Sequence, residues 1–337
     1  MKCSVVILNW NGEETLQHLL PSVLEHTQLP NVEIVVADNG STDGSLDYLR
    51  TQPVRVIALE SNFGFAGGYN HAIEQVESEY TVLLNSDVEV TPHWLDTMLE
   101  YMDFHPDVMA VQPKVLSWHS KQQFKSRKVD AIRFEHAGAA GGMIDVLGYP
   151  YCRGRLMTYV EEDHGQYNEI VPIFWATGAC LLIRIEMYKQ LGGLDANFFA
   201  HQEEIDLCWR LQNKHPFSIF CLPFSVVYHV GGGTLGYENP RKTFLNFRNN
   251  LLMLRKNVSS SQLWWLMTVR FFMDYLAALQ MLFTGQPANF RAVFQARWAY
   301  HKLKQQYPIS TDHSSKAAPL IAKRSIVWDF YIRRMKK

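Results

Sequence analysis

Short apolar runs that end in polar residues alternate with amphipathic segments along the first part of the chain. Apolar runs of this length predict strands that are buried on both faces of a sheet. The predicted strands cover residues 3–8, 32–37, 54–59, 80–84 and 108–112. Leucine and valine recur at helical spacing after the first strand, and a further helix is predicted from Pro92 to about Phe104. Strands alternating with helices predict an α/β fold with a mainly parallel sheet.

The periodicity is lost between residues 117 and 169. We interpret this stretch as a long functional loop region that could cover an active site. Regular patterns return with a strand over 173–183, a short helix over 186–191, a helix near residue 203 and a strand over 218–222. An amphipathic helix is then predicted over 241–256. We place a sheet domain at residues 1–240 and a basic, aromatic-rich helical extension at residues 241–337.

Charge is distributed unevenly, although the formal net charge is only −1. Residues 1–239 hold 15 Lys and Arg against 30 Asp and Glu, whereas residues 240–337 hold 17 against 3. A basic segment of this kind indicates an anionic partner surface, either nucleic acid or a bilayer with acidic lipids. The run at 263–283 is long enough to span a membrane, but it carries Arg270 and Asp274 in its middle. Because these two residues are spaced to pair on one helix face, we expect packing or interfacial immersion and no spanning helix.

The cysteine pattern and the beginning of the chain bear on the compartment. Five cysteines, with no Cys-x-x-Cys pair, support neither a disulfide framework nor a zinc site. The chain begins directly with a predicted strand, without a charged lead and an apolar signal core. We therefore expect a cytoplasmic protein.

A polar triplet, Asn85-Ser86-Asp87, follows the apolar run at 80–84. Ligands of open α/β sheets bind at the carboxyl ends of the strands. A carboxylate at this place can hold a divalent cation, and the cation can hold a diphosphate. Asp87 could instead cap the next helix, but Thr91, followed by Pro92, is better suited to that role.

The strands at 32–37 and 54–59 also lead into polar or glycine-rich turns. Asp38 could accept a hydrogen bond from a pyrimidine N3–H or a ribose hydroxyl, or it could simply form an Asx-turn with Asn39. The stretch from Asn62 to Asn70, which includes Gly64, could bring helix N-terminal amides close to a phosphate, or it could be a tight turn with close helix packing. A doubly wound sheet would place Asp38 and Asp87, at the ends of different strands, side by side.

Two more candidates lie in the second half of the sheet domain. Glu203 and Glu204 are adjacent and stand in the first turn of a predicted helix, where acidic residues often serve only as caps. His229 stands at a strand end and could complete a metal site.

Seven motifs in order make the chain resemble glycosyltransferase family 2, which has the GT-A fold. It is most similar to the branch of bacterial surface-polysaccharide transferases described as rhamnosyltransferases. The resemblance covers residues 3 to about 256. The motifs are residues 5–12, Asp38–Asp43, Asn62–Asn70, Leu84–Asp87, Ala176–Ala179, Glu203–Leu207 and His229.

The resemblance implies a role for each motif. Asp38 would read the nucleobase, in a pocket lined by the turn at Asn9 and Asn11. Asp87 would bind the metal, Mg²⁺ or Mn²⁺, and His229 would contact the metal or the diphosphate. Glu204 would be the general base, with Glu203 or Asp206 as substitutes. Other implied donor-site residues are Asn39, Asn62, Gly64, Asn85 and Ser86, and the implied acceptor-site residues are Trp175, Thr177 and Gly178.

The resemblance also implies an activity and its setting. It implies inverting, metal-dependent transfer of a sugar, rhamnose in the first instance, from a dTDP- or UDP-linked donor to a hydroxyl of a glycan or lipid-linked acceptor. Two departures stand out: Asn85 replaces the first acid of the usual Asp-x-Asp, and Glu204 stands where many relatives have Asp. An acceptor of this kind places the enzyme on the inner face of the plasma membrane, so we expect a membrane partner and no nucleic acid.

Three alternatives remain open. The C-terminal helices could instead form a homodimer interface. A sugar nucleotidyltransferase would share the strand-end carboxylates, but it usually has a basic residue in a glycine-rich loop after the first strand, and Asn9–Gly12 offers none. A non-catalytic, membrane-surface binding protein on the same fold would be favoured if Glu204 pointed away from the Asp87 cleft.

Overall fold

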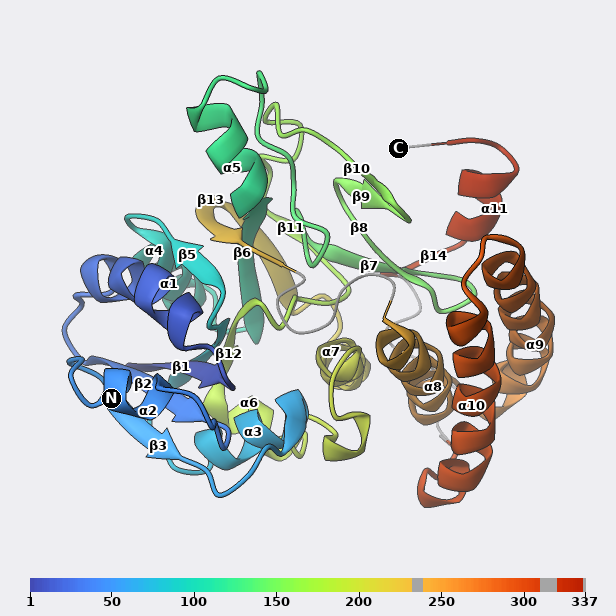
Figure 1. The fold of residues 1–337 in the computed structure, drawn as a ribbon, viewed down its shortest axis with the longest axis horizontal. Helices are drawn as coiled ribbons and strands as arrows, with labels where there is room; N and C mark the ends of the chain where they lie inside the picture. Colours follow the sequence, from blue (N-terminus) through green and yellow to red (C-terminus); the bar gives the residue numbers. More distant parts are fainter. Residues whose placement is uncertain (232–238, 310–319, 336–337) are drawn as a thin grey trace.

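A nine-stranded mixed sheet forms the centre of the structure, a computed structural model that describes residues 1–231, 239–309 and 320–335. The strands lie in the order β11–β13–β6–β12–β4–β1–β2–β3, and β5 pairs with β13 (Figure 1). β1 is parallel to β2 and β4, and β6 is parallel to β13, whereas β12 is antiparallel to both of its neighbours. The bounds are β1 (Cys3–Asn9), β2 (Val32–Asp38), β3 (Arg55–Ala58), β4 (Tyr80–Asn85), β5 (Val88–Val90), β6 (Ala110–Ser117), β11 (Val171–Pro172), β12 (Cys180–Arg184) and β13 (Ile219–His229).

Alternate residues of the strands pack into two apolar cores, because successive side chains of a strand point to opposite faces. Val5 and Ile7 belong to the core that includes α1, α2 and α4, whereas Val6 belongs to the core that includes α3, α6, α7 and α8. The predicted α/β fold with a mainly parallel sheet is confirmed. The helices of this part are α1 (Glu13–His26), α2 (Ser45–Leu49), α3 (Gly64–Ile73), α4 (Trp94–Phe104), α6 (Ile185–Gln190) and α7 (Glu203–Lys214).

The stretch 117–169 is not the structureless loop that the sequence predicts. It contains α5 (Trp118–Lys125) and four short strands, β7 (Gly142–Asp145), β8 (Pro150–Cys152), β9 (Arg155–Leu156) and β10 (Tyr159–Val160). These strands form a second sheet with β14 (Ile321–Ala322) near the C-terminus. Strands of two to four residues are too short to give a periodic signal, which explains why the expectation is wrong.

Two smaller expectations are also corrected. The strand predicted over 173–183 is only the five residues of β12, because the preceding residues form an irregular segment. The helix predicted to begin at Pro92 begins at Trp94, and the Thr91 hydroxyl donates to the Val226 carbonyl, 2.7 Å away, instead of capping the helix. Because β5 lies between Asp87 and α4, Asp87 does not cap that helix either.

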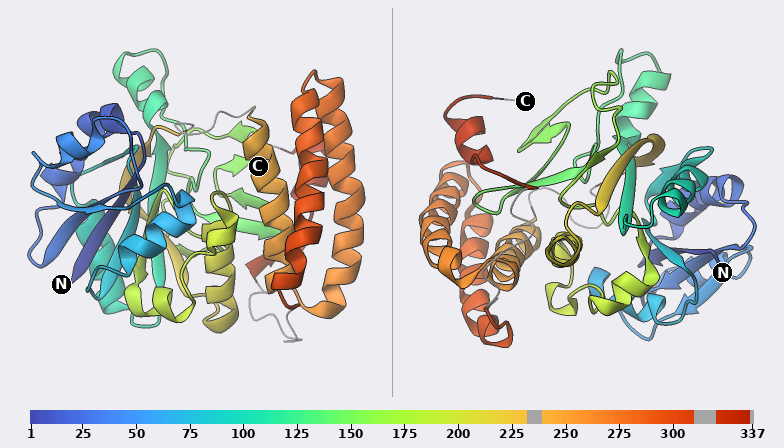
Figure 2. Two further views of the ribbon diagram at one scale, coloured as in Figure 1. Left: turned by 60° about the horizontal axis from the view of Figure 1, so that its bottom comes forward. Right: turned by 180° about the vertical axis from the view of Figure 1, so that it is seen from behind.

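The C-terminal helices form a layer beside α7, with α8 innermost and α9 on the outside (Figures 1 and 2). Their bounds are α8 (Pro240–Asn257), α9 (Ser260–Phe283), α10 (Pro287–Leu303) and α11 (Ile326–Tyr331). The amphipathic helix predicted over 241–256 is therefore present as α8. Residues 310–319 and 336–337 of the predicted extension lie outside the described residues, and its separation from the sheet domain as a unit stays a prediction.

The two charges in the middle of α9 point inward. Arg270 and Asp274 are both buried, and Arg270 Nε lies 3.2 Å from Asp274 Oδ1. Arg297 of α10 completes the cluster, with its Nη2 atom 2.9 Å from Asp274 Oδ2. The predicted pairing on one helix face is confirmed, and the outward side of α9 is left to uncharged residues.

Candidate active site

The carboxyl ends of β1, β2 and β4 meet at one edge of the central sheet. β1 lies between the other two strands, so that Asn9 is paired in register with Asp38, and Leu8 with Asn85. Asp38 and Asp87 therefore belong to the same edge, as expected, but they are separated by one strand and do not follow neighbouring strands. This edge is where ligands of α/β sheets bind.

Asp38 is fully buried in a polar cluster at the carboxyl end of β2. Its Oδ2 atom accepts from Asn9 Nδ2 at 3.0 Å, and its Oδ1 atom accepts from the Ser41 amide at 2.9 Å, a local bond to the residue three positions on in place of the Asx-turn considered for Asp38. Asn9 Oδ1 is buried without a hydrogen-bond partner in the described residues. An unpaired buried acceptor costs free energy, which a ligand N–H placed against it would recover. Asn11 helps to hold the turn that follows Asp38, since its Oδ1 accepts from the Thr42 amide.

The glycine-rich turn after β3 does not present its amides to a phosphate. Asn39 organises the turn: its Oδ1 accepts from the Phe63 amide at 3.0 Å, and its Nδ2 donates to Asn62 Oδ1 and the Gly64 carbonyl. The next two amides, of Phe65 and Ala66, donate to the Phe199 carbonyl. The tight-turn alternative therefore describes this motif.

Asp87 and His229 form a close pair at the end of β4. His229 Nε2 lies 3.0 Å from Asp87 Oδ1 and 3.4 Å from Asn85 Nδ2, and β13 places it there by pairing antiparallel with β5. Burial alone would raise the pKa of Asp87, but the imidazole outweighs it and the pKa of Asp87 is lowered. Burial alone would lower the pKa of His229, but Asp87 outweighs it and the pKa of His229 is raised. The pair is therefore stabilised as an ion pair.

Glu135 is a third member of this cluster that the sequence does not reveal. Its Oε1 lies 3.9 Å from His229 Nδ1, and burial raises the pKa of the carboxyl. The residue stands in the aperiodic stretch after β6, where no pattern marks it. Among the described residues no three His, Cys, Asp or Glu side chains converge as a complete metal site.

Glu203 and Glu204 begin α7, and both carboxyls have a buried oxygen. Glu203 is 3 % exposed, and burial raises its pKa well above the usual range. Burial also raises the pKa of Glu204, to about 7, although hydrogen bonds from the backbone amides of Gln202, Glu204 and Ile205 lower it. The Oε2 atom of each has no hydrogen-bond partner among the described residues. Glu204 lies beside Gly178, where an added Cβ would be 3.6 Å from the Glu204 Cβ.

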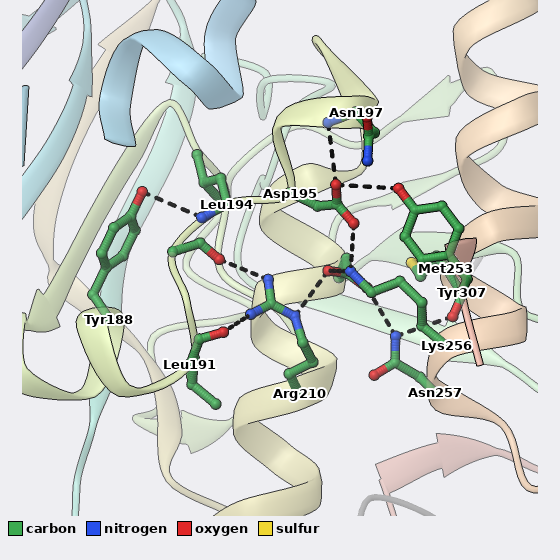
Figure 3. A network of polar contacts seen from close by, with 12 residues as sticks. Tyr188, Leu191, Leu194, Asp195, Asn197, Arg210, Met253, Lys256, Asn257 and Tyr307 are labelled. Carbon is green, nitrogen blue, oxygen red and sulfur yellow. Dashed lines mark hydrogen bonds and ion pairs between the residues drawn. The ribbon is translucent and has the colours of Figure 1, made fainter. Parts of the chain in front are cut away.

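Asp206 belongs to a structural network, and its partners Arg210, Lys256 and Asn257 are labelled in Figure 3. Its carboxylate accepts from Arg210 Nε at 2.9 Å, Lys256 Nζ at 2.7 Å and Asn257 Nδ2 at 2.9 Å, and it is fully buried. A carboxylate with these partners has no free position for a substrate proton. Asp206 therefore ties α7 to α8, and the candidates for the base are Glu204 and Glu203.

The three residues expected at the acceptor are not equivalent. Trp175 is buried, its Nε1 donates to the Met143 carbonyl at 2.8 Å, and its ring covers Gly142. Thr177 is also buried, and its Oγ1 accepts from the Ala179 amide. Both side chains are packed in the core, so Gly178, beside Glu204, is the member of this set next to a candidate catalytic group.

Buried polar side chains at the end of β2, an Asp–His pair at the end of β4 and a buried carboxyl of raised pKa at the beginning of α7 define the class of protein as an enzyme with its site at the carboxyl edge of an α/β sheet. The model of glycosyl transferase family 2 matches residues 4–192, more than half of the chain. The chain belongs to this family, in a branch that resembles rhamnosyltransferases, and it is a glycosyltransferase.

Curated relatives and solved structures agree with this assignment. The chain is 26 % identical over 243 residues to an N-acetylglucosaminyl-diphospho-decaprenol L-rhamnosyltransferase of Mycobacterium tuberculosis, covering 68 % of this chain and 76 % of that protein. The fold is similar to that of S. aureus TarS 1-349 in complex with UDP-GlcNAc (TM-score 0.53, 16 % identity, 88 % and 81 % covered). It is also similar to a Pyrobaculum calidifontis mannosyltransferase in complex with GDP-Man and Mn²⁺ (TM-score 0.52, 14 % identity, 90 % and 79 % covered).

Proposed function

We propose that this glycosyltransferase transfers a sugar, rhamnose in the first instance, from a dTDP- or UDP-linked donor to a hydroxyl of a lipid-linked or glycan acceptor, with inversion. The observation that carries the proposal is Glu204, a carboxyl whose pKa is raised to about 7, next to Gly178, whose neighbour Ala179 accepts through its carbonyl from the amide of Asn85, two residues before Asp87. A general base works best when its pKa is near the working pH.

The chemistry assigned to Glu204 is a single displacement. Its carboxylate removes the proton from the acceptor hydroxyl while that oxygen attacks the anomeric carbon. The bond from the anomeric carbon to the donor diphosphate breaks, and the diphosphate leaves with the electron pair. Attack from the face opposite the leaving group inverts the configuration, and no second carboxylate is needed as a nucleophile. Burial raises the pKa of Glu203 well above its usual range, and Glu203 is the more buried of the two residues, so we assign the role to Glu204.

Asp87, beside His229, is the residue suited to hold a divalent cation. Its carboxylate is the kind of oxygen ligand that Mg²⁺ or Mn²⁺ prefers, and such ions are commonly bound by one or two carboxylates together with substrate phosphates. His229 Nε2, 3.0 Å from Asp87 Oδ1, would add a nitrogen ligand only after losing the proton that the ion pair holds. A cation bound there would neutralise charge that develops on the leaving diphosphate. The solved structure of the similar Pyrobaculum mannosyltransferase holds Mn²⁺, which supports this cofactor class.

The buried acceptor atoms of Asp38 and Asn9 support a pyrimidine-linked donor. Asp38 offers a carboxylate acceptor and Asn9 Oδ1 an unpaired one, and a thymine or uracil base presents an N3–H donor. The similarity to the Mycobacterium tuberculosis rhamnosyltransferase supports rhamnose as the sugar and a lipid-linked, diphosphate-containing acceptor.

Attachment to the cytoplasmic membrane surface is the setting that the outer face of α9 supports. This helix is long and apolar enough to span a bilayer, with a mean hydropathy of 1.3. Its exposed residues carry no charge and include Trp264, Phe271, Phe272, Leu276 and Phe283. Spanning would bring the inward-facing Arg270, Asp274 and Arg297 into lipid at a large cost. We therefore propose peripheral immersion of the outer face, with basic residues of the C-terminal segment contacting acidic headgroups.

The deciding experiment incubates the purified protein with a panel of dTDP- and UDP-sugars, Mg²⁺ or Mn²⁺, and a synthetic N-acetylglucosaminyl-diphospho-lipid. Mass spectrometry identifies the product, and NMR gives the anomeric configuration. We expect transfer of a deoxyhexose with inversion. Retention of configuration, or transfer that continues undiminished in a chelator, would refute the corresponding part of the proposal.

A further inference from the structure

The chain immediately before Glu203 and Glu204 has an unusual backbone. Phe199, His201 and Gln202 have positive φ values of 64°, 70° and 71°. Residues other than glycine avoid this region at a cost of about 1 kcal/mol each. Phe199 also forms a strained γ-turn, in which the Ala200 amide donates to the Phe198 carbonyl at 2.7 Å. Such a turn persists only where its surroundings hold it.

One side of the turn is held by the side chain of Asn249 in α8. Its Nδ2 atom lies within hydrogen-bond distance of three carbonyls of the turn: 3.0 Å from Phe198 O, 2.9 Å from Ala200 O and 2.8 Å from His201 O. Arg248 fixes the orientation of this amide, because its Nε donates to Asn249 Oδ1 at 2.9 Å. Asn249 is fully buried, so water does not compete for these carbonyls.

The other side of the turn rests on the glycine-rich motif. The Phe199 carbonyl accepts from the amides of Phe65, at 2.7 Å, and Ala66, at 3.2 Å, at the beginning of α3. Gly64 is required here, since its φ is +73° and an added Cβ would collide with Phe199. The turn is therefore clamped between α8 and the motif that follows β3.

Gln202, the last residue of the turn, is tied to the same helix. Its Oε1 accepts from Asn250 Nδ2 at 2.8 Å. The Asn250 amide in turn donates to the Gly148 carbonyl and accepts from Arg270 of α9. Three consecutive residues of α8, from Arg248 to Asn250, thus fix the point at which α7 begins.

We infer that Asn249 is a positioning residue for catalysis, which holds the left-handed turn so that Glu204 points at the acceptor hydroxyl. The inference rests on the proposed role of Glu204 as the base. The carboxyl of Glu204 is stabilised by backbone amides of its own turn, and its Oε2 has no partner, so its direction depends on the backbone. Displacement of a catalytic group by about 1 Å can cost about a hundredfold in rate.

The test compares Asn249→Ala with Asn257→Ala. Asn257 is a control for the general attachment of α8 to α7, because it is a buried asparagine of the same helix whose amide donates to Asp206 in the first turn of α7 and to Met253, instead of to the carbonyls of residues 198–201. The assay uses dTDP-L-rhamnose and a synthetic N-acetylglucosaminyl-diphospho-lipid, and thermal unfolding is measured for both variants. We expect both to lose stability, but only Asn249→Ala to lower kcat by about a hundredfold and to displace the acidic limb of its pH profile, with the donor KM little changed.

Arg248→Gln is the second variant, for the case that Asn249→Ala does not fold. This substitution leaves the Asn249 amide in place but removes the guanidinium that orients it. We expect a smaller loss of kcat than in Asn249→Ala, with the same displacement of the acidic limb of the pH profile. Unchanged kcat and pH profile, or equal losses in Asn257→Ala, would overturn the inference while the proposed function stands. Full activity of Glu204→Gln would overturn both, because the base itself would then be elsewhere.

Discussion

Replacing either glutamate at the beginning of α7 by glutamine separates their roles. Glutamine keeps the size of the side chain and mimics the protonated carboxyl. The pKa of Glu203 is raised well above its usual range by burial, which favours the neutral carboxyl, so we expect Glu203→Gln to change little. The pKa of Glu204 is raised to about 7, so Glu204→Gln removes a group that is half ionised there.

The size of the effect follows from general-base catalysis and from titration. Loss of a positioned base typically costs about 10²- to 10⁴-fold in kcat. With a pKa of about 7, roughly a tenth of Glu204 is ionised at pH 6 and roughly nine tenths at pH 8, so the kcat of the unmodified enzyme should rise about tenfold between these values. Glu203→Gln should show the same rise. The measurement is kcat against pH for the two variants and the unmodified protein.

The raised pKa of Glu204 also predicts the direction in which the stability of the fold changes with pH. The pKa of Glu204 is higher in the folded state than its ordinary value of 4.5, so its contribution to stability is present below pH 4.5 and is lost as the pH rises to about 7. Because glutamine stays neutral, Glu204→Gln should be inactive but more stable at pH 8, by at most about 3 kcal/mol. An active Glu204→Gln with an inactive Glu203→Gln would refute the assignment of the base.

The metal site, the membrane face and the buried charge cluster each carry one prediction. Asp87→Ala should abolish transfer, and because it removes the ion-pair partner of the buried His229 it should also lower the unfolding temperature. Transfer that persists in EDTA would contradict the metal role. The double substitution Phe272→Glu and Leu276→Glu should lower co-sedimentation of the protein with phosphatidylglycerol vesicles. The control Phe104→Glu, at an exposed position at the end of α4, should not lower it. Unchanged binding of the double variant would argue for a second copy of the chain as the partner of α9. Asp274→Ala leaves two buried cations unpaired and should destabilise the fold by about 3–5 kcal/mol in a denaturant titration; a loss below 1 kcal/mol would mean that these charges are hydrated.

The central sheet is predictable because its strands are apolar on both faces and end sharply at polar residues. The run before Asn85 and the run before Asp38 are examples, and the register of β1 with both neighbours brings their ends together. The second sheet is not predictable in the same way. Its strands have two to four residues, and β14 comes from the far end of the chain. No local sequence pattern therefore indicates that β14 pairs with β7.

Single residues of the candidate site are likewise predictable only where a sequence pattern marks them. Asp87 and His229 are found from the sequence because each stands at a strand end, and the structure places them 3.0 Å apart. Glu135 is missed because it contacts His229 from an aperiodic segment. Asn249 is missed because a polar residue within an amphipathic helix looks like a surface position, and its burial depends on the turn that packs against it.

The helices of the C-terminal segment present different chemistry on their two sides. On the inner side, Asn249 of α8 holds the turn before Glu204 by hydrogen bonds to backbone carbonyls, and Asn250 donates to the side-chain oxygen of Gln202. The outer side of α9 is apolar and uncharged. Arg270 of α9 links this helix to α8, since its guanidinium contacts both Asn250 and Asp274. Immersion of α9 in a bilayer would therefore set the orientation of the catalytic turn relative to the lipid through direct contacts, which suits an acceptor whose own lipid is anchored in that bilayer.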